Sequence, residues 1–230
     1  LSANFRASDD AAAVERALAL GGDAAEGAHL IVLPLPTFVA SYERLKALDP
    51  RIVGVAAWSS GRDAFYGPSR DSLAERIRGN VRLCGPRSGP ATFLSLYLLE
   101  LSGTGLDAIT VGENNCVSEY LSVDRGGSTE GNASRLVATT ADASTLIPWV
   151  FVAPEAMVEG EAERGVLARW MKVWFEGVSA LRSDVPGGAR TIAGETSADP
   201  VSLLQRLGQI EIADLGQNAA AFGLSGRDSV

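Results

Sequence analysis

Short apolar runs alternate with helical patterns along most of the chain. Residues 29–33 (HLIVL) and 51–58 (RIVGVAAW) are continuous apolar runs, which is typical of strands covered on both faces. Asp9 or Asp10 is placed to cap a helix ending at Gly21-Gly22, and Thr37 to cap one that reaches about Leu48. The alternation predicts βαβ units, and therefore an α/β fold with mostly parallel sheets.

The remaining pattern extends this prediction to the rest of the chain, which is expected to be entirely helical after Pro154. Further strands are predicted over 1–6, 81–84, 106–111, 136–139 and 147–153, and further helices over 69–78, 91–101, 161–181, 189–194, 199–207 and 214–222. The longest helix carries an apolar face formed by Val166, Leu167, Trp170, Val173, Trp174 and Val178.

Composition and charge exclude several classes of protein. The 230 residues are 46% hydrophobic and 21% charged, which is typical of a globular chain. The net charge is −8 and no cluster of Lys or Arg occurs, so we expect no nucleic-acid partner. No apolar run reaches about 18 residues, so no segment is predicted to span a membrane.

The residue types that carry most catalysis are scarce. His29 is the one histidine, and no second histidine or paired cysteine lies near it in the sequence, so we expect no zinc site. The G-x-S-x-G, P-loop and G-x-G-x-x-G patterns are also missing. Glu113, Glu119, Asp124 and Asp142 could in principle act as acid–base groups. The prediction is nevertheless a protein without enzymatic activity, metal or cofactor.

The two cysteines leave two alternatives. Cys84 and Cys116 each end an apolar run, where buried free thiols are common. We therefore expect two buried thiols. A disulfide is the alternative, and it requires Cα atoms within about 7 Å of each other, which a sequence does not establish.

Small polar residues gather at the carboxyl ends of three predicted strands, where open α/β sheets bind ligands. The candidates for ligand binding are Pro36, Thr37, Trp58, Ser59, Ser60, Arg87, Ser88, Gly89 and Thr92. Trp58 is read in two ways, as core packing at a strand end or as a platform for a flat ring.

The loop at 85–90 has the most specific pattern of the three. Pro90 suits the first turn of a helix, and the unpaired N–H groups of that turn form an anion site. Arg87 could add a charge-assisted hydrogen bond to the same anion, and Gly89 permits a close approach of the backbone. The alternative is that Ser88 only caps its own helix, which contributes about 1 kcal/mol.

Several segments resemble the type-2 periplasmic binding proteins, in the ABC-importer group that takes up sulfonates, nitrate or thiamine precursors. The segments LIVLPLPTFVASYERLKALDPRIVGVAAWSSGRDA and NVRLCGPRSGPATFLSLYLLELSGTGLD resemble ligand-loop segments of the two lobes. RLVATTADASTLIPWVFVAPEAM is similar to the return crossover, and LARWMKVWFEGVSAL and ADLGQNAAAFGLSG resemble the closing helices. Together these segments cover most of the chain.

The resemblance implies a two-lobed α/β fold, each lobe a mostly parallel sheet flanked by helices, with a helical C-terminal tail. Lobe one would hold residues 1–57 and 149–230, and lobe two residues 58–148. Crossovers near 56–59 and 147–151 would form a hinge that closes on the solute. The resemblance also adds Asp142, in TTADAS, as a ligand contact, with a turn cap as the alternative.

The function implied is the substrate-binding component of a bacterial ABC importer. Its partners would be a small, mainly anionic solute such as a sulfonate, nitrate or phosphate, and an ABC permease. We expect a monomer, in the periplasm or tethered to the cell envelope.

The family's first strand and ligand loop have no counterpart ahead of Asp9, which keeps a second hypothesis open. In it, the chain is a noncatalytic envelope module that has lost solute binding and contacts a protein or peptidoglycan-associated partner. A third hypothesis, an enzyme on the same architecture, is disfavoured because His29 lies outside the predicted loops.

Overall fold

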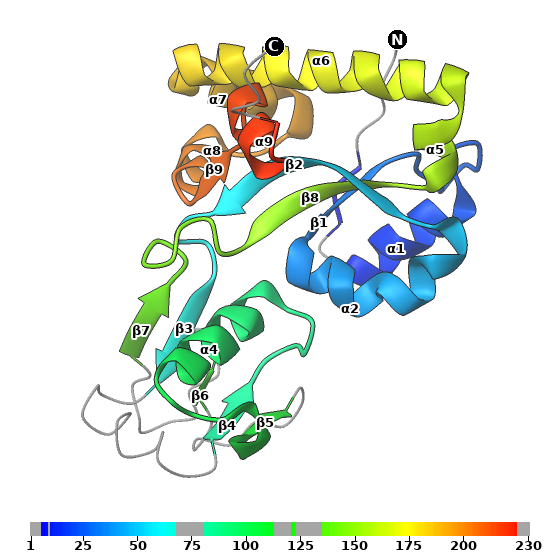
Figure 1. Cartoon of the computed structure of the whole chain (residues 1–230). Coiled ribbons are helices and arrows are strands. Elements are labelled where there is room, and N and C mark those ends of the chain that lie inside the picture. Colours follow the sequence, from blue (N-terminus) through cyan, green and yellow to red (C-terminus); the bar gives the residue numbers. More distant parts are fainter. Residues whose placement is uncertain (1–5, 9, 68–80, 113–120, 123–134, 225–230) are drawn as a thin grey trace. The chain divides into compact units, whose positions relative to one another are not determined.

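The computed structural model describes residues 6–8, 10–67, 81–112, 121–122 and 135–224 (Figure 1). The described strands are β1 (Ile31–Pro34), β2 (Arg51–Ser59), β3 (Ala64–Gly67), β4 (Val81–Cys84), β5 (Ile109–Gly112), β6 (Leu121–Ser122), β7 (Arg135–Thr139), β8 (Pro148–Ala153) and β9 (Ile210–Ile212). The described helices are α1 (Ala11–Leu20), α2 (Leu35–Leu45), α4 (Pro90–Leu101), α5 (Glu155–Glu159), α6 (Glu161–Ser183), α7 (Val185–Thr196), α8 (Pro200–Leu207) and α9 (Leu215–Ala221). Short 3₁₀ helices occupy Lys46–Leu48 and Leu106–Ala108.

The ends of α1 follow directly from its flanking residues. The carboxylate of Asp10 accepts a hydrogen bond from the amide of Ala12 at 2.9 Å, so Asp10 is the N-cap, as its position predicts. Gly21 ends the helix with φ of 76°, a conformation that glycine adopts without steric cost. Both predicted boundaries of this helix are confirmed.

Other parts of the predicted pattern need correction. Strand β9 lies in the segment that was expected to be entirely helical after Pro154. Three residues are too few to show a period, so its apolar residues are read equally well as helix. The strand predicted over 1–6 falls, except for Arg6, outside the described residues, and so does the helix predicted over 69–78.

Two small sheets have mixed strand directions. The first has the order β1-β8-β2-β9, and the pairs β1–β8 and β2–β9 are antiparallel. The second has the order β5-β4-β6-β3-β7, in which β4 runs parallel to β5 and β6 while β3 runs antiparallel to β6 and β7. The prediction of mostly parallel sheets is therefore wrong. Strand β8 returns from far along the sequence and lies between β1 and β2, an order that a linear βαβ pattern does not reveal.

The chain divides into two compact units. Unit 1 comprises 1–56, 149–184 and 213–230, and unit 2 comprises 57–148 and 185–212. The lobes expected from the sequence place 185–212 with lobe one, whereas these residues belong to unit 2. The lobe boundaries otherwise stay a prediction.

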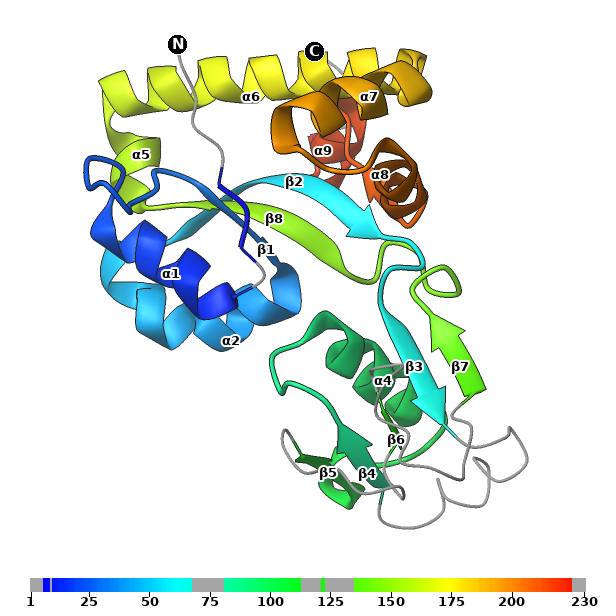
Figure 2. The ribbon, with the colours of Figure 1, turned by 180° about the vertical axis from the view of Figure 1, so that it is seen from behind.

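In unit 1, helices cover both faces of the sheet: α6 lies on one side of β1, β2 and β8, and α1 and α2 lie on the other (Figures 1 and 2). Alternate side chains of β8 point to opposite faces of the sheet, so this strand packs against the helices on both sides. Val150 and Val152 belong to the core beneath α1 and α2, whereas Phe151 packs edge-on against Trp170 and Trp174 of α6. The strand is therefore apolar throughout, as a strand covered on both faces requires.

The predicted apolar face of α6 is only partly buried. Trp170 and Trp174 stack at a ring distance of 5.9 Å, and Val178 is buried. Val166 and Val173 remain exposed at 39% and 63%, so the buried stripe is narrower than the sequence pattern indicates.

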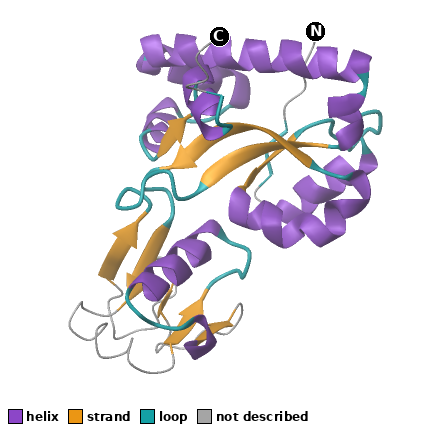
Figure 3. Ribbon diagram, in the orientation of Figure 1, coloured by secondary structure: helices purple, strands orange, loops and turns teal. Residues whose placement is uncertain are grey.

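In unit 2, α4 packs on β3 and β4 of the five-stranded sheet (Figure 3). The core is formed by Phe65, Val81, Leu83 and Leu99. Cys84 ends β4 and is disulfide-bonded rather than a buried thiol, which corrects that expectation. The other cysteine of the sequence, Cys116, lies outside the described residues.

Candidate functional site

The candidate residues of unit 1 lie at the start of α2. Pro34 ends β1 and is also the N-cap of α2, so the helix begins earlier than predicted. Thr37 is consequently a buried residue of the first turn and not the cap. Its carbonyl accepts a hydrogen bond from the Ser41 hydroxyl at 2.8 Å, while Pro36 is half-buried beside it.

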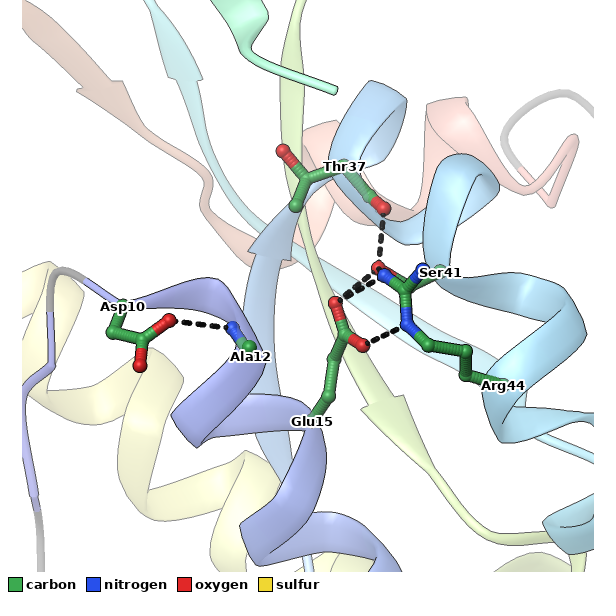
Figure 4. A network of polar contacts seen from close by, with 6 residues as sticks. All are labelled: Asp10, Ala12, Glu15, Thr37, Ser41 and Arg44. Carbon is green, nitrogen blue, oxygen red and sulfur yellow. Dashed lines mark hydrogen bonds and ion pairs between the residues drawn. The ribbon is translucent and has the colours of Figure 1, made fainter. Parts of the chain in front are cut away.

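An ion pair with a buried carboxylate and an exposed guanidinium joins α2 to α1 next to these residues (Figure 4). Glu15 of α1 is 6% exposed, and both of its carboxylate oxygens accept hydrogen bonds from Arg44 of α2, at 2.7 and 3.0 Å. The Ser41 hydroxyl also bonds to Glu15. The hydrogen bond from Arg44 lowers the pKa of Glu15, against the opposing effect of burial. Sequence reasoning did not identify this cluster, since a lone Glu on a helix usually faces solvent.

The candidate residues at the end of β2 have different surroundings. Trp58 is half-buried and pairs with Glu211 of β9, and the Ser60 amide donates to the Gln209 carbonyl at 2.9 Å. Ser59 is fully buried, and its hydroxyl is held by Asp63. As ligand contacts these three residues stay predictions.

Asp63 and Thr140 are polar residues that the sequence analysis missed. Thr140 Oγ1 lies 2.8 Å from Ser59 Oγ and accepts the amide of Gly61 at 2.9 Å. Asp63 and Thr140 are 8% and 0% exposed. Burial raises the pKa of Asp63, opposed by the Ser59 hydrogen bond and by the charge of Arg62.

The loop before α4 is closed by hydrogen bonds to one carbonyl. The Gly89 amide and the Thr92 hydroxyl donate to the Pro86 carbonyl, at 2.9 and 2.8 Å. Thr92 is fully buried, so its side chain shapes the loop from inside. Pro90 lies in the first turn of α4, as predicted, and the N-cap is Gly89, while Ser88 is half-buried one position earlier.

Arg87 belongs to the same loop. It is exposed and lines an open pocket of about 360 Å³ together with Ile109, Thr110 and Val111 of the edge strand β5. The pocket thus combines a cationic group, a hydroxyl and two branched apolar side chains.

Asp142 occupies the turn after β7. Its carboxylate accepts the Thr139 amide at 2.8 Å, and the Thr139 hydroxyl lies 3.4 Å away. The residue therefore caps this turn, which is the alternative that the sequence left open.

The helix starts differ in how their N–H groups are compensated. Asp10, Asp199 and Asp214 cap α1, α8 and α9 through their carboxylates. Helices α5 and α6 carry glutamates in the first turn, Glu155 and Glu161 among them. Helices α2 and α4 have neither a side-chain cap at the N-cap position nor an acid in the first turn. The N-cap residue and the first turn of these two helices therefore supply no carboxylate to the positive end of the dipole.

The part of the chain that the structure describes lacks two further types of site. No group of three or more His, Cys, Asp or Glu residues there is arranged to hold a metal ion. None of the described helices is long and apolar enough to cross a membrane.

The comparisons with known proteins give one informative result. No family model matches the sequence, and no curated protein matches it either. Among solved structures, the chain is similar to the alkanesulfonate-binding protein SsuA from Xanthomonas axonopodis pv. citri bound to MOPS. The TM-score is 0.52 at 16% sequence identity, covering 80% of this chain and 68% of that one. The chain therefore has the mixed α/β fold of a periplasmic binding protein.

Proposed function

We propose that this chain binds a small anionic solute as the substrate-binding component of an ABC importer. The observation that carries the proposal is the start of α4, where a helix whose N-cap and first turn contain no acidic residue follows a loop that bears Arg87. The fold supports it, because the similar protein SsuA binds an alkanesulfonate. The solute would be a sulfonate, nitrate, phosphate or similar anion.

The chemistry of this loop suits an anion better than a neutral ligand. Amides in the first turn of a helix have no partner within the helix and carry the positive end of its dipole. Pro86 fills the space beside Gly89 and its carbonyl accepts the Gly89 amide, so an anion would approach the amides of the first turn that follow Pro90. Arg87 would add a charge-assisted hydrogen bond of fixed geometry. Ser88, Arg87 and the first-turn amides of α4 are the contacts that we propose in unit 2, with Pro36 and Thr37 at the start of α2 as those in unit 1.

The same function implies a mode of solute capture, an oligomeric state and a receiving partner. Capture would occur between two lobes by hinge closure, the chain would act as a monomer, and an ABC permease would receive the solute. The disulfide at Cys84 supports a location in an oxidising compartment such as the periplasm.

A thermal-shift screen tests this function. Sulfate, nitrate, phosphate, short alkanesulfonates and neutral pyrimidines would each be added to the purified chain. An anion at about 100 times its dissociation constant should add about 2.7 kcal/mol and raise Tm by several degrees. Arg87→Gln should remove the shift, whereas the matched variant Arg82→Gln, at an exposed position of β4, should retain it. The absence of a shift with every compound would favour the envelope module that contacts a macromolecular partner.

A further inference from the structure

A buried carboxylate lies close to where the chain enters and leaves the main segment of unit 2. Asp63 is in the turn after β2, shortly after unit 2 begins at residue 57, and Thr140 is in the turn after β7, before that segment ends at residue 148. Both side chains are buried, and Ser59 between them is fully buried. Within the described residues, Asp63 forms no salt bridge.

The hydrogen atoms of this cluster can be assigned from the chemistry of its groups. The Asp63 oxygen beside Ser59 accepts both in the ionised carboxylate and in a carboxyl that carries its proton on the other oxygen, so the Ser59 hydroxyl donates to Asp63. Thr140 Oγ1 accepts the amides of Gly61 and Asp63, at 2.9 and 3.4 Å, which occupies both of its lone pairs. Because Ser59 gives its own hydrogen to Asp63, Thr140 is the donor to Ser59 Oγ at 2.8 Å, and the other acceptor near its hydroxyl, the Asp63 carbonyl, lies farther away at 3.5 Å. The hydrogen bonds run in one direction, from Thr140 through Ser59 to Asp63.

Main-chain hydrogen bonds join the same two turns. The Thr140 amide donates to the Asp63 carbonyl at 2.9 Å, and the Ser59 amide donates to the Ile147 carbonyl at 3.0 Å. The segments 59–63 and 140–147 are thus connected by both side chains and backbone. Breaking the side-chain bonds would expose the Asp63 carboxyl to water while leaving β2 and β7 in place.

The charged surroundings of Asp63 are sparse. Arg62, exposed on the same turn, is the one charged side chain that opposes the effect of burial. On the turn after β7, the carboxylate of Asp142 accepts the Thr139 amide. On β9, Glu211 is the strand partner of Trp58. Burial raises the pKa of Asp63 despite Arg62, so the closed cluster binds a proton more tightly than a hydrated one. Lowering the pH therefore favours the closed cluster.

We propose that Ser59, Asp63 and Thr140 form a protonation-dependent lock between the turn after β2 and the turn after β7. The lock closes as Asp63 takes up a proton and loosens as the carboxyl ionises and hydrates. Residues 57–63 and 139–148 would then move as one piece at acidic pH and more independently at higher pH. This inference does not depend on which solute the chain binds.

Amide hydrogen exchange of the full chain, followed by NMR between pH 4 and 8, tests the lock. The readouts are the protection factors of the Gly61, Asp63 and Thr140 amides, in which the intrinsic pH dependence of exchange is already removed. They should rise as the pH falls, by about tenfold for each unit by which the pKa of the closed cluster exceeds that of the open one. Asp63→Asn should make them independent of pH, because the amide is nearly isosteric and does not titrate. Asp142→Asn is the matched control on the turn after β7, and its protection factors should depend on pH as they do in the unchanged chain.

A second variant separates the lock from the stability of the whole chain. Thr140→Val removes the acceptor of the Gly61 and Asp63 amides, so their protection should fall about tenfold or more at every pH, while that of Val152 in unit 1 stays unchanged. An equal loss at Val152 would mean that exchange reports global unfolding, which would overturn the lock. Protection factors that do not change with pH in the unchanged chain would overturn it as well. So would a dependence that persists in the Asp63→Asn variant.

Discussion

Arg44 on α2 donates two hydrogen bonds to the carboxylate of Glu15 on α1, from Nε at 2.7 Å and from Nη2 at 3.0 Å. Glu15 is buried, whereas the side chain of Arg44 is 63% exposed. The pair therefore combines a desolvated carboxylate with a cation that keeps most of its hydration. This geometry fixes the position of α2, whose N-terminus is a proposed solute contact.

Replacing Glu15 should weaken the packing of α1 on α2. Glu15→Gln keeps the volume but removes the charge and one acceptor oxygen, so we expect a loss of about 1 to 3 kcal/mol in the free energy of unfolding. Urea denaturation measures this value. Glu43→Gln is the matched control, because Glu43 lies on the exposed side of α2 and its surface pair with Lys46 should contribute less than about 1 kcal/mol. Equal effects of the two substitutions would contradict a specific role for the buried pair.

The same pair predicts how unit 1 responds to acid. The pKa of Glu15 is lowered in the folded state, so its stabilising contribution is present above the unfolded pKa, about 4.3. That contribution is lost as the pH falls through the lower folded value. Urea midpoints measured from pH 6 down to pH 2.5 should decline, and the decline should be shallower in Glu15→Gln. Asp63 in unit 2 contributes with the opposite sign, because its folded pKa is raised.

Two glycines should respond to alanine in opposite directions. A Cβ at Gly54 of β2 would lie 2.7 Å from Met171 Cε and 3.3 Å from Phe151 Cδ2. The methionine end can move but the packed ring of Phe151 has little room, so Gly54→Ala should cost about 1 to 3 kcal/mol. Gly177 of α6 has open space at the same position, and Gly177→Ala should stabilise the helix by about 0.5 to 1 kcal/mol. Thermal melts of both variants test the prediction, and a Tm for Gly54→Ala at or above the original would contradict it.

Asn218 connects α9 to the backbone of β2. Its Oδ1 accepts the Val55 amide at 2.7 Å and its Nδ2 donates to the Val55 carbonyl at 3.0 Å. Asn218→Ala leaves both buried backbone groups without these partners, so we expect a loss of about 2 to 4 kcal/mol in urea denaturation. Asn218→Asp should lose at least as much, since a carboxylate cannot donate to the Val55 carbonyl. Gln205→Ala, at an exposed position of α8, serves as the control and should change the free energy of unfolding by less than about 0.5 kcal/mol.

The sequence predicted local elements better than their arrangement. β2 and α4 start and end within a residue or two of their predicted bounds, because apolar runs, Pro90 and Gly103 are local signals. Strand directions were missed because they depend on pairing between distant segments, such as β1 with β8 and β3 with β7. The polar clusters were missed for the same reason: Glu15 with Arg44, and Ser59 with Thr140, are brought together only by the fold.

In the candidate site too, local patterns were predicted and side-chain contacts were not. Pro90 in the first turn of α4 was recognised because such helix-start patterns are local. The sequence could not show that Thr92 points into the loop, nor that the carboxylate of Asp142 is occupied by Thr139.

Calorimetric titration of an anion into the chain, with a charge placed at α4, tests solute binding most directly. Ala91→Glu puts an acid in the first turn, where it should stabilise α4 by about 0.3 to 1 kcal/mol while repelling an anion from the same N–H groups. Ala91→Gln is the uncharged control of the same length. We predict that the anion selected by the thermal-shift screen binds the unchanged chain and the Ala91→Gln variant with similar Kd. It should bind the Ala91→Glu variant at least tenfold more weakly, although that variant has the higher Tm. Equal affinity of all three proteins would contradict an anion site at the start of α4.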